Sequence, residues 1–146
     1  MNEQHRNYLE RIGMSSVLIE RCRSLYEFYA TLLPDEAWDI FVTELVTSEG
    51  TRQYDSLWFF SQRYAAEAKR FLAEDDFDFT LIGKAVYHWE IKKQDYDFRS
   101  ATDKSRLSIA FHFLHEITGE LKASKENCDS LRDVFVRYIM PNFIEG

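Results

Sequence analysis

The segment Asp103–Ile139 constrains the fold of this chain more than any other, because its hydrophobic period changes along it. In its first part apolar residues recur at every second position, as in a strand with one buried face: Leu107, Ile109, Phe111 and Phe113. In its last part apolar residues recur at helical spacing, as in a helix with one buried stripe: Cys128, Leu131, Val134, Phe135, Tyr138 and Ile139. Ser124, a favoured N-cap residue, lies between the two patterns. The segment therefore predicts a sheet that leads into a closing amphipathic helix.

The N-terminal part of the chain predicts two helices. They are expected near Glu3–Ile12 and Ser16–Leu33, and Pro34 ends the second because its ring disfavours a helical residue before it. One apolar stripe of the second helix is expected to face the core: Leu18, Cys22, Leu25, Phe28 or Tyr29, and Leu32. The chain thus opens with a helical segment that can pack on a sheet.

The middle of the chain predicts a run of short strands without intervening helices. The expected strands are Ala37–Ser48, Ser56–Ser61, Phe77–Leu81, Val86–Lys92, Arg106–Leu114 and Glu120–Ala123. Gln62–Leu72 has a helix-favouring composition, but its position favours a strand that pairs back on the preceding one. This order predicts an α+β protein: an antiparallel β-sandwich or partly open barrel with N-terminal helices and a capping C-terminal helix. We expect one domain, 1–146, divided into a helical segment 1–34, a β region 35–123 and a final helix 124–141.

Composition limits the classes of function. The chain has 146 residues, of which 16% are aromatic, so a substantial core is expected. The net charge of -7 disfavours binding to nucleic acid or to an anionic membrane, and it leaves room for a basic partner. No apolar run approaches the roughly 20 residues of a membrane span, and no secretion signal is recognisable at the N-terminus. Cys22 and Cys128 form no CxxC pair, which agrees with a reducing, cytoplasmic location.

No motif in the sequence indicates a catalytic, metal or cofactor site. His112 and His115 have the HxxH spacing, but residues three apart on a strand point to opposite faces. The acidic run at 74–78 lacks the glycine and glutamate that a calcium loop requires. A GxSxG elbow and a glycine-rich phosphate loop are also missing from the sequence. We therefore expect no cofactor, no metal and no catalytic residues.

An interaction surface is predicted where aromatic and charged residues alternate. Tyr96 and Phe98 lie within the sequence DYDF, and exposed aromatics between acids can anchor a protein interface. Arg99, Arg106 and His88 complete this candidate surface.

The strand pattern resembles the pleckstrin-homology-like fold, in particular its small bacterial versions. The matching stretches are SLWFFSQRYAAEA, TLIGKAVYHWEIKK, RLSIAFHF and the final helix from Ser124, so the resemblance covers roughly Asp39–Ile139. It implies two nearly orthogonal antiparallel sheets closed by a C-terminal helix, and a non-catalytic platform for peptides, proteins or lipid headgroups. Lipid-binding members carry several basic residues in the first hairpin loop. Here that loop, Thr47–Tyr54, has Arg52 as its one base, so phosphoinositide binding is not expected.

Three functions remain open from the sequence. The first is a non-catalytic binding or adaptor module with a protein or peptide partner, in which the helices of Met1–Leu33 offer a surface for a homodimer. The second is a small enzyme or ligand carrier with a site between the sheet and these helices, built from Asp95, Asp97, Arg99 or His88. The third is an acidic inhibitor or immunity-type protein that captures a basic partner.

Overall fold

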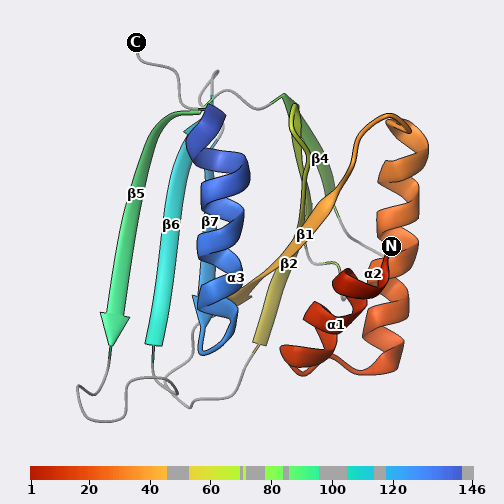
Figure 1. Cartoon of the computed structure of the whole chain (residues 1–146), viewed down its shortest axis with the longest axis horizontal. Coiled ribbons are helices and arrows are strands. Elements are labelled where there is room, and N and C mark those ends of the chain that lie inside the picture. Colours follow the sequence, from red (N-terminus) through yellow and green to blue (C-terminus); the bar gives the residue numbers. More distant parts are fainter. Residues whose placement is uncertain are drawn as a thin grey trace. The chain divides into compact units, whose positions relative to one another are not determined.

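A computed structural model describes residues 1–45, 53–69, 71, 78–83, 86–95, 105–113 and 118–142 of the chain. It is an α+β structure with helices at both ends of the described chain and two antiparallel sheets between them (Figure 1). The chain divides into two compact units. The first contains Met1–Val42 and Asp55–Ile82, and the second contains Thr43–Tyr54 and Gly83–Gly146.

The first unit opens with α1 (Glu3–Arg11) and α2 (Ser16–Leu32), close to the bounds that the sequence predicts. Asn2 caps α1 by accepting a 2.9 Å hydrogen bond from the backbone N–H of His5. Gly13 separates the helices with φ of 90°, a left-handed conformation in which a residue without Cβ is favoured. Ser15 then caps α2 by accepting a hydrogen bond from the Leu18 N–H.

One sheet has the strand order β1 (Asp39–Leu45), β2 (Gln53–Phe60), β3 (Tyr64–Lys69) and β4 (Asp78–Gly83). The strand expected within Gln62–Leu72 is confirmed, since β3 pairs antiparallel with β2 and Phe59 lies opposite Ala66. The alanines favour helix intrinsically, but as small residues they fit opposite the aromatic side chains of β2. Tertiary pairing therefore overrides local propensity in this segment.

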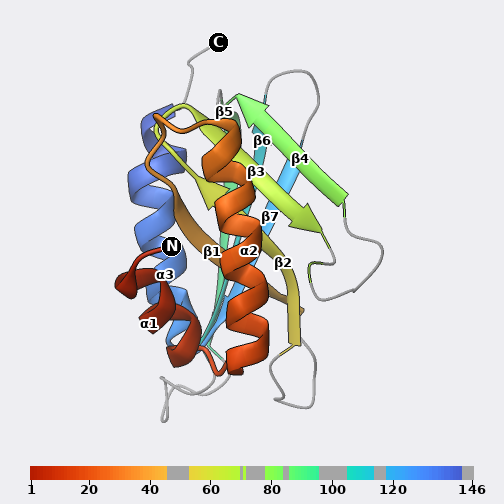
Figure 2. The same ribbon diagram turned by 90° about the vertical axis from the view of Figure 1, so that its right-hand side faces the viewer.

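Helix α2 lies over one face of this sheet (Figure 2), and buried aromatic side chains from both elements contact one another. The rings of Tyr29 and Phe59 are 4.7 Å apart, and the Tyr29 ring lies 6.1 Å from that of Trp38. Helix α1 adds a polar contact at β1, where the backbone N–H of Val42 donates to the Tyr8 hydroxyl at 2.9 Å. The first unit is thus a helical layer packed on one face of a sheet.

The second unit contains a sheet of β5 (Val86–Asp95), β6 (Ser105–Phe113) and β7 (Thr118–Ser124), paired antiparallel in that order. Leu107, Ile109 and Phe111 are buried on β6, which confirms the two-residue period in this part of the strand. The final helix packs against β6 and β7 (Figure 1). It comprises α3 (Asn127–Val134), a π-helical turn (Phe135–Ile139) and a 3₁₀ turn (Met140–Asn142).

The predicted start of this helix is wrong. Ser124 is the last residue of β7. The N-cap position of α3 is occupied by Glu126, whose side chain makes no capping hydrogen bond. The Ser124 hydroxyl instead donates to the carboxylate of Glu44 at 2.7 Å. Lys125 follows in a left-handed conformation with φ of 53°, so a tight turn separates the strand from the helix.

Candidate functional site

Of the five residues predicted to form an interaction surface, the structure describes the backbone of His88 and Arg106. Tyr96, Phe98 and Arg99 lie outside the described residues, so their role stays a prediction. The backbone of His88 lies on β5 opposite His112, and that of Arg106 lies on β6 opposite Gln94. His88 and Gln94 are six residues apart on one strand, a separation of about 20 Å. His88 and Arg106 are therefore at distant positions along the same sheet.

The second unit contains a buried polar cluster around the carboxylate of Glu44, which the sequence analysis did not predict. Glu44 is 1% exposed and accepts hydrogen bonds from the backbone and hydroxyl of Ser124 and from the side-chain amide of Asn127, at 2.7–2.8 Å. Thr43 beside it accepts from the backbone N–H of Lys122 at 2.8 Å. Both carboxylate oxygens of Glu44 are engaged by these donors, so the cluster joins β1 to the start of α3 rather than offering a free base.

The two cysteines are not nucleophiles at neutral pH. Burial raises the pKa of Cys22 to about 12. Burial, with the charges of Glu44 and Asp129, raises the pKa of Cys128 to about 11. Both thiols therefore stay protonated, and the thiolate is the reactive form.

His5 is a second polar group that the sequence gave no reason to select. Its ring is buried between α1 and β1, with Nε2 3.5 Å from Oδ1 of Asp39. Its Nδ1 accepts from the backbone N–H of Asn2 at 3.3 Å, so the neutral ring carries its proton on Nε2. Both nitrogens thus serve the helix cap and the strand contact, which leaves no lone pair for general-base catalysis.

The described parts of the chain offer no metal-binding cluster of three or more His, Cys, Asp or Glu residues. Within the first unit, the contacting rings of Tyr29, Phe59 and Trp38 lie between α2 and its sheet. This packing gives no support to a ligand site between that sheet and the N-terminal helices. None of the described helices has the length and hydrophobicity needed to cross a bilayer.

The exposed face of α2 is the strongest candidate for an interaction surface. Val17, Phe28 and Leu32 are 76%, 47% and 52% exposed. Leu32 was expected in the core, and that expectation is wrong. The buried residues of the helix include Cys22 and Leu25, as expected, together with Ile19 and Tyr29. Of the two residues left open for the core position, Tyr29 is the buried one, because it fits against Phe59 and Trp38.

The apolar residues of this face share one side of α2. Their spacing, with Arg21 and Ser24 between them, runs 17, 21, 24, 28 and 32, which is one stripe of a helix with 3.6 residues per turn. We call these five residues the α2 stripe. The sequence signal was available, since α2 carries apolar residues around most of its circumference and only one face can be buried.

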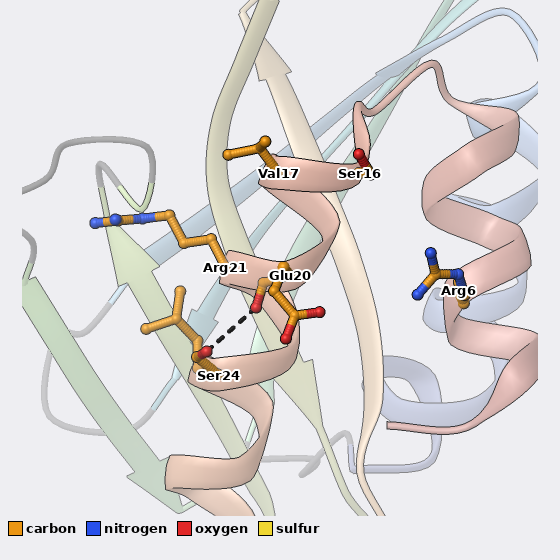
Figure 3. Close-up of a pocket in the computed structure, with 7 residues that line it drawn as sticks. Arg6, Ser16, Val17, Glu20, Arg21 and Ser24 are labelled. Carbon is orange, nitrogen blue, oxygen red and sulfur yellow. Dashed lines mark hydrogen bonds between the residues drawn. The ribbon is translucent and has the colours of Figure 1, made fainter.

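A shallow pocket of about 630 Å³ lies at the N-terminal half of the α2 stripe (Figure 3). Its lining residues come from α1 and α2: Arg6, Ser16, Val17, Glu20, Arg21, Ser24 and Leu25. Figure 3 shows Val17, Arg21 and Ser24 projecting from successive turns, with Arg6 across from them on α1. A hydrogen bond from Arg23 lowers the pKa of Glu20, so this carboxylate stays charged at neutral pH. The pocket therefore combines an exposed apolar side chain with charges of both signs.

Other exposed apolar residues are more dispersed. Val136 and Met140 lie one turn apart on the final helix, and Ile91 lies on β5. Isolated apolar residues of this kind are normal on protein surfaces. The α2 stripe differs because three such residues align along the full length of one helix.

Comparison with known proteins places this chain in no family. No protein-family model matches it, and neither a curated protein nor a solved structure is significantly similar to it.

Proposed function

We propose that this chain is a non-catalytic binding module that engages a protein partner through the α2 stripe. The observation that carries the proposal is the exposure of Val17, Phe28 and Leu32 in line on a helix whose opposite face is fully packed. An amphipathic or apolar helix face is a common docking element, because residues at i, i+4 and i+7 present side chains to a groove or to another helix. The buried side chains of His5, Thr43 and Glu44 are engaged in a helix cap and in strand contacts, as expected for a platform rather than an active site.

We also propose that the two sheets and the final helix form a pleckstrin-homology-like arrangement. The order of elements supports this: antiparallel strands β1–β4, antiparallel strands β5–β7, then a helix that packs on the second sheet. Such a domain would serve as the scaffold, and α1 and α2 would be an added binding element.

Affinity capture with matched variants tests the binding proposal. The wild-type chain, a Phe28→Glu variant and a Val136→Glu control are immobilised and exposed to a lysate of cells that encode the chain. Val136 is 54% exposed on the final helix, so the control places the same charge on a comparable apolar site. Retained proteins are quantified by mass spectrometry, and circular dichroism establishes that each variant is folded.

We expect discrete proteins, which can include further copies of the chain, to be retained by the wild type and by the control. The Phe28→Glu variant should retain them at least about tenfold less, as for loss of an aromatic anchor. Equal retention by all three chains would contradict the assignment of binding to the α2 stripe.

A further inference from the structure

We infer that the partner on the α2 stripe is a second copy of this chain, held in an antiparallel α2–α2 pair about a twofold axis beside Ser24. The inference rests on the proposed function and names the occupant of the same surface. It follows from the symmetry of the stripe and from the distribution of charge along the chain.

The α2 stripe is complementary to itself when reversed. An axis between Ser24 and Leu25 places Val17 opposite Leu32 of the second copy, and Arg21 opposite Phe28. A twofold interface requires this relation, because each residue that contacts a partner must in turn be contacted by its equivalent. The central position is Ser24, a small exposed residue that allows two helix backbones to approach closely.

Each facing pair has a favourable chemistry. Val17 and Leu32 remove apolar surface from water, and both are more than half exposed in the single chain. Arg21 donates through Nε to the backbone carbonyl of Phe71 in its own chain, so only the terminal nitrogens of its guanidinium would meet the ring of Phe28, in a cation–π contact. The pairs extend from Val17 to Leu32, or about 22 Å of helix, so the whole length of α2 takes part.

Charge favours a second copy over a charged partner of another kind. The chain carries a net charge of -7, but Met1–Leu33 contains four acidic and four basic residues. Within α2, Arg23 is paired with Glu20 and, at 2.6 Å, with Glu27. The net negative charge therefore lies in the residues after Leu33. Two copies that meet through Met1–Leu33 bring neutral segments together, which limits the charge repulsion between the two chains. A basic partner would find no excess of negative charge on the stripe to attract it.

The expected dimer is weak. A single pair of helices about 25 Å long gives an interface at the small end of specific complexes, below about 1,200 Å² in total. We therefore expect a monomer–dimer equilibrium that depends on concentration in the micromolar range, rather than an obligate dimer.

Sedimentation analysis of the full chain over about 2–300 μM tests the inference. The wild type should shift from the monomer mass of 17.4 kDa towards twice that mass. Phe28→Glu should remain monomeric over the range, and Val136→Glu should behave as the wild type. A wild-type monomer at every concentration, or a dimer that Phe28→Glu leaves intact, would overturn the inference.

Two double variants test the register. In the antiparallel pair, Val17→Lys with Leu32→Glu places opposite charges face to face at both ends, so the dimer should survive. Val17→Lys with Leu32→Lys places like charges face to face and should abolish it. In a parallel pair each residue would face its own equivalent, so both variants would place like charges face to face and neither would dimerise. Loss of the dimer in the first variant, with a folded chain by circular dichroism, would overturn the antiparallel arrangement.

Failure of this inference can be separated from failure of the proposed function. If the wild type stays monomeric while capture still finds a different protein that depends on Phe28, only the second copy is wrong. If neither self-association nor capture depends on Phe28, both proposals fall.

Discussion

At the scale of single residues, the buried groups of this chain are structural rather than reactive. Glu44 shows why: a carboxylate loses its hydration when buried, and three donated hydrogen bonds replace the lost water. His5 and the two cysteines follow the same rule, with each polar atom engaged or held neutral. Three predictions follow from residues of this kind.

Replacing the Glu44 carboxylate should be costly. Glu44→Gln keeps the volume but places an NH₂ group among donors, so at least one buried hydrogen bond is lost. We expect the free energy of unfolding to fall by about 2 kcal/mol. Urea denaturation measures this, with Glu120→Gln on β7 as the control, since that side chain is 53% exposed and should change stability by less than about 0.5 kcal/mol. Equal effects of the two substitutions would contradict the role given to Glu44.

The two thiols should differ in reactivity although both are protonated. Cys22 is fully buried, whereas Cys128 is partly accessible. In the native chain at neutral pH, alkylation should be slow at Cys128 and slower still at Cys22, as mass spectrometry of the labelled peptides can show. Rapid native labelling of Cys22 would mean that the first unit opens easily.

Glu67 should make stability depend on pH in an unusual direction. Burial raises the pKa of this carboxyl above its ordinary value, so the folded chain holds the proton to higher pH than the unfolded chain. The contribution of Glu67 to the free energy of unfolding is fully present below the pKa of this carboxyl in the unfolded chain. It is lost as the pH rises through the higher pKa of the same carboxyl in the folded chain. Glu67→Gln keeps an acceptor for the Ser56 hydroxyl, which now donates at 2.9 Å.

The variant should therefore be more thermally stable than the wild type at neutral pH, and the difference should shrink towards about pH 4. Thermal melts across this range measure the difference. A constant difference at all pH values would show that the Glu67 charge is not responsible.

At the scale of elements, the stability of helix α1 depends on its N-cap residue, Asn2. The Asn2 side chain accepts from the His5 backbone N–H, and Nδ1 of His5 accepts from the Asn2 backbone N–H, which makes a reciprocal capping box. Asn2→Ala should lower the free energy of unfolding by about 1 kcal/mol, and Asn2→Asp should restore most of the loss because it keeps the acceptor. Denaturant titration of the three chains measures both effects. If Asn2→Asp is as destabilised as Asn2→Ala, the cap is not the cause.

The same scale shows what the sequence could and could not predict. Periodicity located the helices and most strands, because each of these segments has one face that must be buried. The strand within Gln62–Leu72 was predicted from its position after the preceding strand, against a helix-favouring composition. Periodicity failed for Leu32 and left Phe28 or Tyr29 open, since α2 has two apolar stripes and only the fit of Tyr29 against Phe59 selects between them. The prediction of Ser124 as an N-cap also failed, because its hydroxyl donates to Glu44, which lies about 80 positions earlier in the sequence. Long-range partners of this kind leave no mark on local sequence.

At the scale of the whole molecule, each compact unit is built from two separate stretches of sequence. The strand β1 contributes Asp39–Val42 to the first unit and continues as Thr43–Leu45 in the second. The side chains of Thr43 and Glu44 then hydrogen-bond to residues of β7 and α3. Neither unit is therefore a contiguous piece of chain that could be removed without cutting into the other.

Because a strand is shared, the two units should unfold together. Pulsed alkylation in increasing urea reports on the first unit through Cys22 and on the second through Cys128. We expect the two midpoints to coincide, as in a single cooperative domain. Separate midpoints would show that the second unit melts while the first stays folded, or the reverse.

The contact between Tyr8 and Val42 has a consequence for how the chain behaves in a crowded cell. β1 ends its sheet, and an end strand with unpaired amides is a template on which another chain can add a strand and begin an aggregate. The phenol of Tyr8 occupies one of those amides. Helix α1 thus makes this one amide unavailable to an added strand.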